Sequence, residues 1–592
     1  NLISVQTNDA KMLLLVDSQN PKEQFLFLEI DPVSLTLATQ KSLVKPQEKI
    51  IASTAIIDSR DTGFLVVGCR YCMIALYDLK DNHSLCAYYK NKVKGDTVSH
   101  FEFRSANAET RELSIYATMK DGRYYIVKTN KEHCLEILAD NRLQKRFVEG
   151  CFVDPSEHFL LYGFKSTYFF VWDETRQYEV LRVECGGPHR QWSFKHSYDT
   201  NGRLRYRFIF TRATEIQLLQ NGKSPYVEVL ESGLHGREVR SMAVVDGCSK
   251  GEKLVISGGE DTTVKLSVLT ENGSIKQLWT QRQHGSGLQS VHKVNNDYVL
   301  SSSAREELYL WKIHRENGQN PCMSLYRTVK PLSTHPDLRV MDFDTIEVKQ
   351  DEIDIGFVVA AVYSNSQIRV WYFNYKENTF KILVEDRYRS CCVLGVHFVV
   401  FDDKMYAMLS STNGNITVYE VGSVLRRYFR MVGTNDKCYL VPRAGSSMDD
   451  FSASNLGVLA CDPHVHQSSI KDLDFSYTSP DAIQIVTGGD DNGIALSTLV
   501  ISQGKLSFNT LSFIPDAAAS TVTCVCLVSI THVLIASVDQ KVRLWSLDNH
   551  TLTLVEDGYT TVADTGCIAL AKFISGQKLG LIAGAGVSSW RV

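Results

Sequence analysis

Two patterns in the 592-residue chain resemble metal-binding or acid–base sites, namely a cysteine pair and two carboxylate pairs. Cys69 and Cys72 form a C-x-x-C. A structural zinc site needs about four ligands, usually from two such pairs, and the sequence has no second pair. We therefore interpret these thiols as structural. The carboxylate pairs are Glu260-Asp261 and Asp490-Asp491, where a turn carboxylate accepts backbone N–H bonds, so we expect a structural role here too.

Histidines open four of the repeated units described below: His235, His284, His335 and His466. They are not spaced like metal ligands, so we expect each to bond the acidic turn of its unit. The sequence contains no P-loop, G-x-S-x-G or H-E-x-x-H, and no helix follows Gly584-Ala585-Gly586 to complete a dinucleotide fingerprint. A propeller enzyme would need acids, bases or metal ligands at the centre of its ring, and we expect no such cluster.

Basic residues alternate with aromatic residues in two segments, 203–208 and 426–430. Such segments bind RNA phosphates and stack bases, or they are solvated strand faces. The candidate contacts in them are Arg205, Arg207, Arg426, Arg427 and Arg430.

The elements that position these residues are short strands. Runs of β-branched and aromatic residues bounded by Gly, Asp, Asn and Ser dominate, and helical periodicity is scarce. One unit recurs, most clearly as Ala536-Ser537-Val538-Asp539 followed by 541–545. Seven copies from Leu234 onward predict seven four-stranded units that close into a β-propeller. The last unit ends on its third strand near Trp590, and residues 226–230 are a candidate for its outer strand.

About five weaker copies precede these units, with third strands near residues 25–28, 74–78, 124–127, 169–173 and 214–217. We predict an all-β chain with two propeller domains, residues 1–222 and 223–592. Because the sequence begins with Asn1, we expect absent upstream residues to complete the first ring. The alternative is that two degenerate units in this region escape the pattern. The long non-repeat segment 421–465 is expected to be a loop that is functional or disordered.

Composition limits the alternatives. The net charge is -4, so no global basic field recruits nucleic acid. The 15 cysteines are scattered and often lie in apolar runs, which indicates a reducing compartment and a cytoplasmic location. No apolar run approaches the roughly 20 residues that span a bilayer, so we expect no membrane association.

The repeated units resemble WD repeats, and Trp172-Asp173 matches their closing dipeptide. Two segments depart from the repeat, His235-Gly236-Arg237-Glu238-Val239 and the segment 185–192, which contains Gly186-Gly187-Pro188-His189-Arg190. Both are similar to motifs of the WD-repeat partner of the tRNA wobble-position ribose 2′-O-methyltransferase. The resemblance covers most of residues 185–590.

This resemblance implies a non-catalytic subunit that forms a heterodimer with the methyltransferase and seats tRNA for methylation at nucleotide 34. The chain itself would bind no cofactor, since S-adenosylmethionine binds the methyltransferase. The candidate contacts in the two motifs are His189, Arg190, His235, Arg237 and Arg240. The alternative is a general WD-repeat scaffold, such as a ubiquitin-ligase substrate receptor or a trafficking adaptor.

Overall fold

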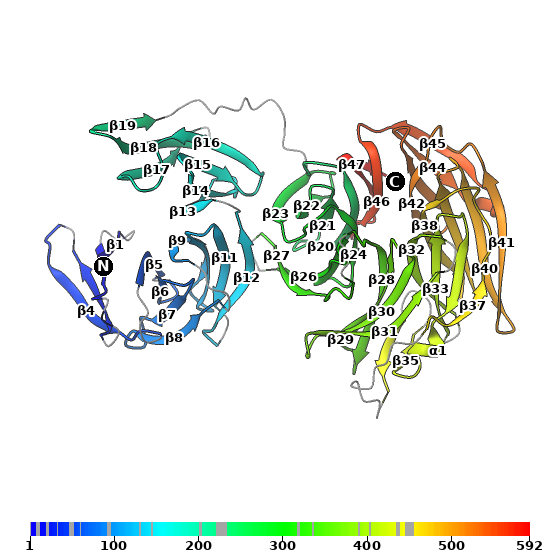
Figure 1. Ribbon diagram of the computed structural model, residues 1–592, viewed down its shortest axis with the longest axis horizontal. Helices are drawn as coiled ribbons and strands as arrows, with labels where there is room; N and C mark the ends of the chain where they lie inside the picture. The colour runs from blue at the N-terminus through cyan, green and yellow to red at the C-terminus, as the bar shows by residue number, and fades with distance from the viewer. Residues whose placement is uncertain are drawn as a thin grey trace. The chain divides into compact units, whose positions relative to one another are not determined.

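The computed structural model describes residues 2–6, 12–18, 20, 23–31, 33–46, 52–59, 61–91, 96–129, 132–143, 146–200, 204–220, 234–315, 320–333, 335, 337–388, 391–401, 404–433, 438–443 and 455–592. Nearly all regular secondary structure of the described chain is β-strand (Figure 1). It divides into two compact units, which we call the N-terminal unit (1–232) and the C-terminal unit (233–592). The predicted boundary at 221–222 lies outside the described residues.

The N-terminal unit contains four antiparallel four-stranded sheets and one three-stranded sheet among its described residues. Their strands are β1 (Leu2–Gln6), β2 (Met12–Val16), β3 (Phe25–Ile30) and β4 (Leu37–Leu43); β5 (Ala52–Ser59), β6 (Phe64–Cys69), β7 (Ile74–Asp78) and β8 (Ser84–Tyr89); β9 (Val98–Asn107), β10 (Glu112–Met119), β11 (Arg123–Thr129) and β12 (Leu135–Arg142); β13 (Phe147–Val153), β14 (Phe159–Lys165), β15 (Tyr168–Asp173) and β16 (Tyr178–Glu184); and β17 (Trp192–Tyr198), β18 (Leu204–Arg212) and β19 (Glu215–Gln220). The five predicted third strands correspond to β3, β7, β11, β15 and β19. Completion of this ring by further residues stays a prediction.

The C-terminal unit contains seven sheets among its described residues, as the repeat count predicts. Their strands are β20 (Val239–Asp246), β21 (Glu252–Gly259), β22 (Val264–Thr270) and β23 (Ile275–Gln281); β24 (Leu288–Lys293), β25 (Tyr298–Ser303), β26 (Leu308–His314) and β27 (Cys322–Thr328); β28 (Val340–Gln350), β29 (Ile353–Tyr363), β30 (Gln367–Asn374) and β31 (Thr379–Arg387); β32 (Val393–Phe401), β33 (Lys404–Ser411), β34 (Ile416–Glu420) and β37 (Val458–Cys461); β38 (Ile470–Ser479), β39 (Ala482–Gly489), β40 (Ile494–Ser502) and β41 (Lys505–Ile514); β42 (Val522–Ser529), β43 (His532–Ser537), β44 (Lys541–Ser546) and β45 (Thr553–Tyr559); and β46 (Ala563–Lys572) and β47 (Lys578–Arg591). A short 3₁₀ turn, Asp548–His550, joins β44 to β45.

The first strand of each sheet is the inner strand of a closed ring. In chain order the inner strands are β20, β24, β28, β32, β38, β42 and β46. Each packs against the next, and β46 packs against β20. Closure removes the long exposed sheet edges that an open stack would leave. These sheets therefore form a propeller.

Every inner strand of this ring shifts register near its start. In six of them the shift skips the second residue, which has no Cα partner on the neighbouring strand. These residues are Arg240, Gln289, Met341, Leu394, Lys471 and Thr523. Such bulges turn a side chain away from the regular alternation of the strand. All six bulges lie at the start of an inner strand, so they lie at the same end of the ring.

The seventh sheet ends on a returning strand. The backbone N–H of Val592 donates to the carbonyl of Lys578 at 3.3 Å, which places the chain end beside the start of β47. Gly586 lies between them with φ +120°, a conformation that favours glycine. This agrees with the prediction that the last unit ends on its third strand. The predicted outer strand, residues 226–230, lies outside the described residues.

The segment 421–465 is not simply a loop. Its described part contains helix α1 (Gly422–Leu425) and the hairpin β35 (Phe429–Val432) and β36 (Tyr439–Pro442), which extends the third sheet beside β28. The same segment supplies β37, the outer strand of the fourth sheet. Val424, Leu425 and Phe429 are buried in the core of these sheets. The prediction of a loop is therefore wrong for the described part.

Among the described residues, no helix has the length and apolar character needed to cross a membrane.

Candidate functional site

His235 belongs to the framework of the C-terminal unit. Its side chain is fully buried, with Nδ1 2.9 Å from Asp261 Oδ1 and Nε2 2.8 Å from Ser257 Oγ. Burial lowers the pKa of His235 and favours the neutral ring. Burial opposes ionisation of Asp261, but hydrogen bonds from His235, Thr263 and the Gly236 N–H outweigh it and hold the pKa of Asp261 below its ordinary value. The predicted bond to the acidic turn is confirmed, and His235 is unavailable to a partner.

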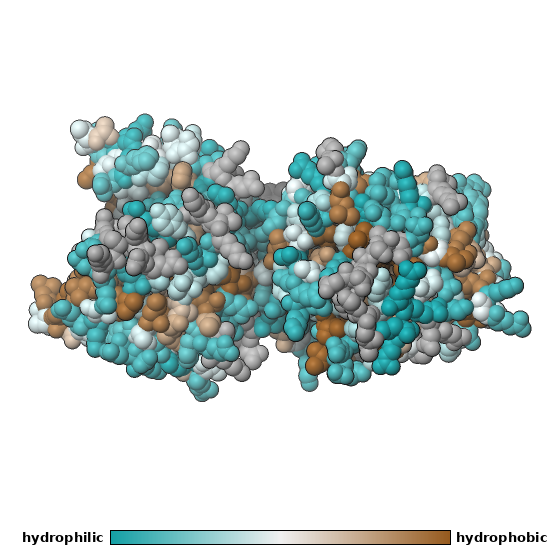
Figure 2. Space-filling view, turned by 60° about the horizontal axis from the view of Figure 1, so that its bottom comes forward, coloured by the Kyte–Doolittle hydropathy of each residue, from teal (hydrophilic) through white to brown (hydrophobic). Residues whose placement is uncertain are grey.

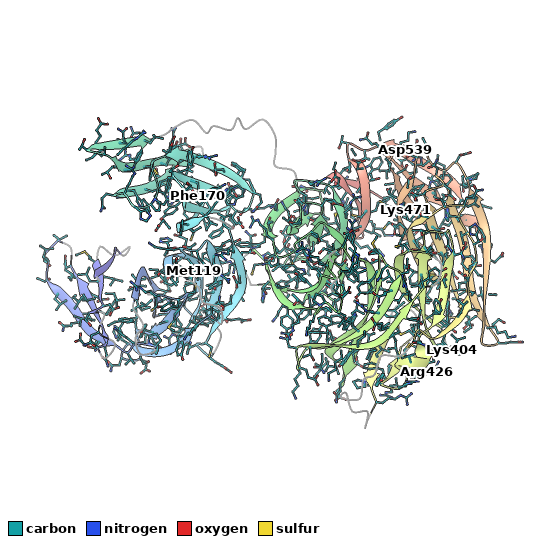
Figure 3. The ribbon with its side chains drawn as sticks, in the orientation of Figure 1. Met119, Phe170, Lys404, Arg426, Lys471 and Asp539 are labelled. Atoms are coloured by element: carbon teal, nitrogen blue, oxygen red, sulfur yellow. The ribbon has the colours of Figure 1, made fainter. Side chains whose placement is uncertain are left out.

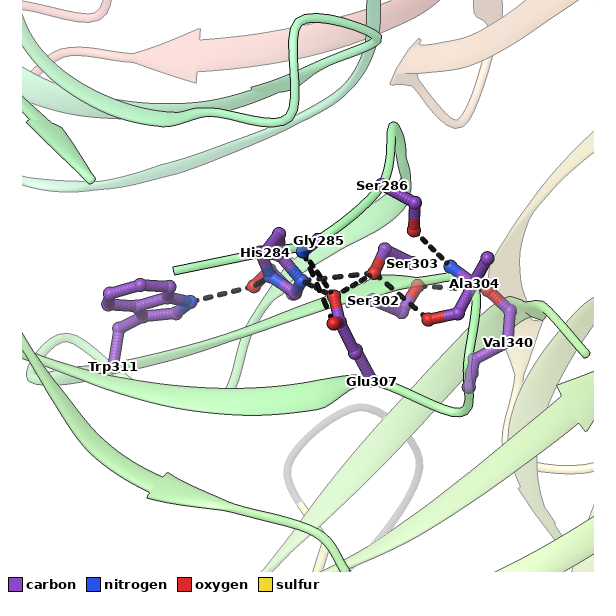
Figure 4. A network of polar contacts seen from close by, with 10 residues as sticks. His284, Gly285, Ser286, Ser302, Ser303, Ala304, Glu307, Trp311 and Val340 are labelled. Atoms are coloured by element: carbon purple, nitrogen blue, oxygen red, sulfur yellow. Dashed lines mark hydrogen bonds and ion pairs between the residues drawn. The ribbon is translucent and has the colours of Figure 1, made fainter. Parts of the chain in front are cut away.

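The same arrangement recurs in the second and fifth sheets. His284 Nε2 lies 2.6 Å from Ser301 Oγ, which also accepts a bond from Trp311 Nε1 at 2.7 Å (Figure 4). Its Nδ1 lies 2.9 Å from Glu307, which replaces the expected Asp. In the fifth sheet, His466 Nδ1 lies 2.9 Å from Asp491 Oδ1. The His–acid network is thus a property of the repeat and not of one motif.

His335 does not follow this pattern, so the prediction for it is wrong. The ring is exposed, and its Nδ1 accepts the N–H of Asp337 at 3.3 Å. A buried ion pair instead joins Arg369 of the third sheet to Glu306 of the second, 2.9 Å apart and each 3% exposed. This pair links two neighbouring sheets, whereas each His–acid bond lies within one unit.

Arg237 and Arg240 are the exposed members of the motif around His235. The Arg237 side chain is 65% exposed and its Nε is 3.7 Å from Glu238. Arg240 Nε lies 2.9 Å from Glu260, and Lys471, at the same bulge position, lies 3.1 Å from Asp490. The label of Lys471 in Figure 3 shows the end of the ring at which the inner strands begin. These cations are therefore accessible to a partner.

The segment 185–192 forms the turn between β16 and β17. Gly186 and Gly187 have φ values of +90° and +96°, which explains the glycine pair. Arg190 covers Gly186 so closely that an added Cβ would lie 2.4 Å from its Nε, and its Nη1 donates to the carbonyl of Thr211 at 3.1 Å. Arg190 thus closes the turn, whereas His189 is exposed.

Arg205 and Arg207 lie on the exposed face of β18, whose other face carries the buried Tyr206 and Phe208. Arg205 Nη2 is 3.1 Å from Asp199, and Arg207 lies opposite Lys195 in the strand register. The arginines are available to phosphates. Base stacking on the interleaved aromatics is excluded because those rings are buried in the core.

Arg426, Arg427 and Arg430 are exposed, while Tyr428 and Phe429 between them are buried. Arg426 Nη2 is 2.7 Å from Glu420. In Figure 3, Arg426 and Lys404 lie at the opposite end of the sheets from Lys471 and Asp539. The candidate arginines of the C-terminal unit therefore lie at two ends of the ring and do not form one patch.

The residues of the remaining sequence motifs have structural roles. Cys69 and Cys72 are buried, and burial raises the pKa of each thiol to about 12. Asp491 accepts the N–H of Gln467 at 2.9 Å, as expected for a turn carboxylate. Gly584 approaches the carbonyl of Asp564, where an added Cβ would lie 2.4 Å from the oxygen. Among the described residues, no group of His, Cys, Asp or Glu side chains is arranged to hold a metal ion.

Sequence reasoning missed the titratable side chains of the inner strands, and the expectation of no acids or bases at the ring centre is wrong. Asp342 and Asp344 on β28, Asp472 and Asp474 on β38, His292 on β24 and His397 on β32 interact electrostatically around the ring. Each of the four carboxylates accepts a backbone N–H from the next inner strand. The signal in the sequence was an Asp-x-Asp on alternate strand positions.

The chain was compared with protein-family models and with curated proteins. No protein-family model matches the chain. The tRNA (34-2'-O)-methyltransferase regulator WDR6 of Homo sapiens and that of Pongo abelii are each 21% identical over 76% of this chain and 45% of their own length. The Drosophila melanogaster protein of the same name is 19% identical over 87% of this chain and 48% of its own length.

The chain spans less than half of the length of these curated relatives. The chain is therefore similar, along most of its length, to the WD-repeat regulators of tRNA (34-2'-O)-methyltransferase.

Proposed function

We propose that this protein is a non-catalytic subunit that binds a tRNA 2′-O-ribose methyltransferase as a heterodimer in the cytoplasm and positions tRNA for methylation at nucleotide 34. The observation that carries the proposal is the similarity to regulators of that enzyme over 76% of the chain. A positioning subunit accelerates the reaction by holding the ribose in reach of the active site, without supplying chemistry. S-adenosylmethionine is assigned to the methyltransferase.

The exposed cations support this role. Arg205, Arg207 and Arg237 are exposed, whereas the buried residues beside them in the same segments pack or form hydrogen bonds within the fold. Hydrophilic side chains cover much of the face seen in Figure 2, and hydrophobic side chains are exposed between them. A mixed surface of this kind suits phosphate contacts by arginine together with a protein interface.

Affinity purification of the full-length protein followed by mass spectrometry tests the proposal. We expect the methyltransferase to copurify at a stoichiometric level and tRNA to be retained at low salt. The alternative, a general WD-repeat scaffold, predicts ubiquitin-ligase or coat subunits in place of the methyltransferase. Purified chain alone is expected to methylate no tRNA, whereas addition of the methyltransferase is expected to produce modification at nucleotide 34.

A further inference from the structure

One end of the C-terminal unit carries exposed cations on its first three sheets. Neighbouring strands of these sheets run antiparallel, so the first and third strands begin where the second ends. We call this the entry end of the ring. In the loops, turns and bulges of the first three sheets at this end, the exposed cations are Arg237, Arg240, Arg305, Lys330 and Arg339, which we call the basic half. Among the described residues there, Asp337 is the one exposed acid.

The other side of the entry end carries acids. In the corresponding loops, turns and bulges of the fifth, sixth and seventh sheets, Lys471 is the one exposed cation among the described residues. The exposed acids there are Asp462, Asp516 and Asp564. The chain as a whole has a net charge of -4. A polyanion that approaches this end is therefore attracted to the basic half and repelled by the opposite side.

Arg305 is presented by an unusual turn between β25 and β26. Arg305 and Glu306 have φ values of +62° and +56°, a left-handed conformation that is unfavourable for residues with a Cβ. The corresponding turns of the first, third, fifth and sixth sheets have one left-handed residue each, namely Thr262, Ser366, Asn492 and Gln540. Glu306 is buried, where it accepts the N–H of Ser333 at 3.1 Å and lies 2.9 Å from Arg369. The buried glutamate therefore holds the turn, and the turn directs Arg305 to solvent.

A glycine-containing loop joins the cations of the first sheet to those of the second. A Cβ on Gly287 would lie 2.7 Å from Glu260, whose carboxylate is 2.9 Å from Arg240 Nε. A Cβ on Gly285 would lie 3.7 Å from Arg305 Nη1. Arg240 and Arg305 thus flank the same loop, and its glycines leave space between them.

The same turn of the second sheet borders the loop that enters the third. The N–H of Glu306 donates to the carbonyl of Leu338 at 2.9 Å, directly before Arg339. Arg339 Nε lies 3.4 Å from Asp337, and the two side chains are 49% and 70% exposed. Ion pairs between exposed side chains are weak, so this pair does not prevent contact with an anion. The basic half is therefore continuous over three neighbouring sheets.

We propose that the basic half binds the phosphate backbone of RNA, so that the entry end of the propeller, and not the end with Arg426 and Arg430, contacts the nucleic acid. Arginine donates to phosphate oxygens through a planar fork. Cations spread over three sheets match the repeated charges of a polymer better than the single carboxylate of a protein side chain. The inference rests on the proposed function for the identity of the RNA, which is tRNA.

The test compares Arg305→Gln/Arg339→Gln with Arg426→Gln/Arg430→Gln, a matched pair of exposed arginines at the opposite end of the ring. Filter binding of a tRNA transcript to the purified full-length protein is measured over a range of salt concentrations. We expect the first variant to bind roughly tenfold more weakly at low salt, and the slope of log affinity against log salt to fall by about one for each arginine. The second variant is expected to bind like the wild type. Arg237→Gln/Lys330→Gln replaces the first variant if that variant does not fold.

Three outcomes would overturn the inference. Wild-type affinity in both basic-half variants, or a loss confined to Arg426→Gln/Arg430→Gln, would exclude this end and leave the proposed function intact. Basic-half variants that kept tRNA but no longer copurified with the methyltransferase would show that this surface is a protein interface. A wild type that bound no tRNA would overturn the inference together with the tRNA-binding part of the proposed function.

Discussion

The two segments that depart from the repeat use their polar residues differently. In the turn 185–192, Arg190 makes one hydrogen bond to a backbone carbonyl and covers a glycine. In the segment 234–240, His235 is completely buried and bonded on both ring nitrogens. His284 and His466 repeat the second arrangement in other sheets. The glycine-rich turn instead bonds to Thr167 in the sheet before it and to Thr211 in the sheet after it. A motif that resembles that of a known family can therefore be part of the general framework, and its exposed neighbours are the candidates for partner contacts that we propose.

The largest expected effect is that of His235→Ala. The substitution removes two buried hydrogen bonds and leaves the Asp261 carboxylate without its main partner. We expect a loss of about 2–4 kcal/mol in the free energy of unfolding of the C-terminal unit. Urea denaturation measures it, and Arg237→Ala is the control, since its side chain is 65% exposed. Equal stability of the two variants would contradict the structural role of His235.

A smaller effect is expected for Arg190→Ala. It removes one bond to Thr211 and uncovers Gly186, so a loss of about 1 kcal/mol is expected in the N-terminal unit. His189→Ala is the matched control because the neighbouring ring is exposed. If His189→Ala destabilised the unit more than Arg190→Ala, the division into buried and exposed members would be wrong for this turn.

The smallest effect on stability is expected for the double variant Arg205→Ala/Arg207→Ala. Both side chains are exposed, so the free energy of unfolding should change by less than about 0.5 kcal/mol. If these residues contact tRNA phosphates, the affinity falls and the salt dependence of binding weakens by about one unit of slope per arginine. Filter binding at several salt concentrations measures both. Unchanged affinity would remove these residues from the proposed interface.

Much of the architecture was predictable because it repeats. Strands ending in small-residue turns recur often enough to predict seven sheets in one unit and five in the other, and the third strands fall where the sequence places them. The hairpin β35–β36 was missed because its pattern occurs once and because it pairs with β28, a strand that lies far before it in the sequence.

The candidate site was less predictable for two physical reasons. Alternation of basic and aromatic residues indicates a strand or turn with one buried face. Tyr206 and Phe208 lie on that buried face, so they cannot stack on RNA bases, which was one of the two predicted roles of this segment. A bond from His335 to the acidic turn of its unit was predicted from the position of His335 in the repeat. The buried pair found in this region, Arg369 and Glu306, comes from adjacent sheets and meets only in the folded ring. Likewise, ring closure alone brings Asp342 and Asp472 into electrostatic contact.

Ribose methylation at nucleotide 34 is the direct readout of the proposed function. It is measured by mass spectrometry of tRNA fragments from cells that lack the full-length protein, before and after re-expression. We expect the 2′-O-methyl group at this nucleotide to be lost without the protein and restored by the wild type. Normal methylation of nucleotide 34 in cells without the protein would rule out the proposed function.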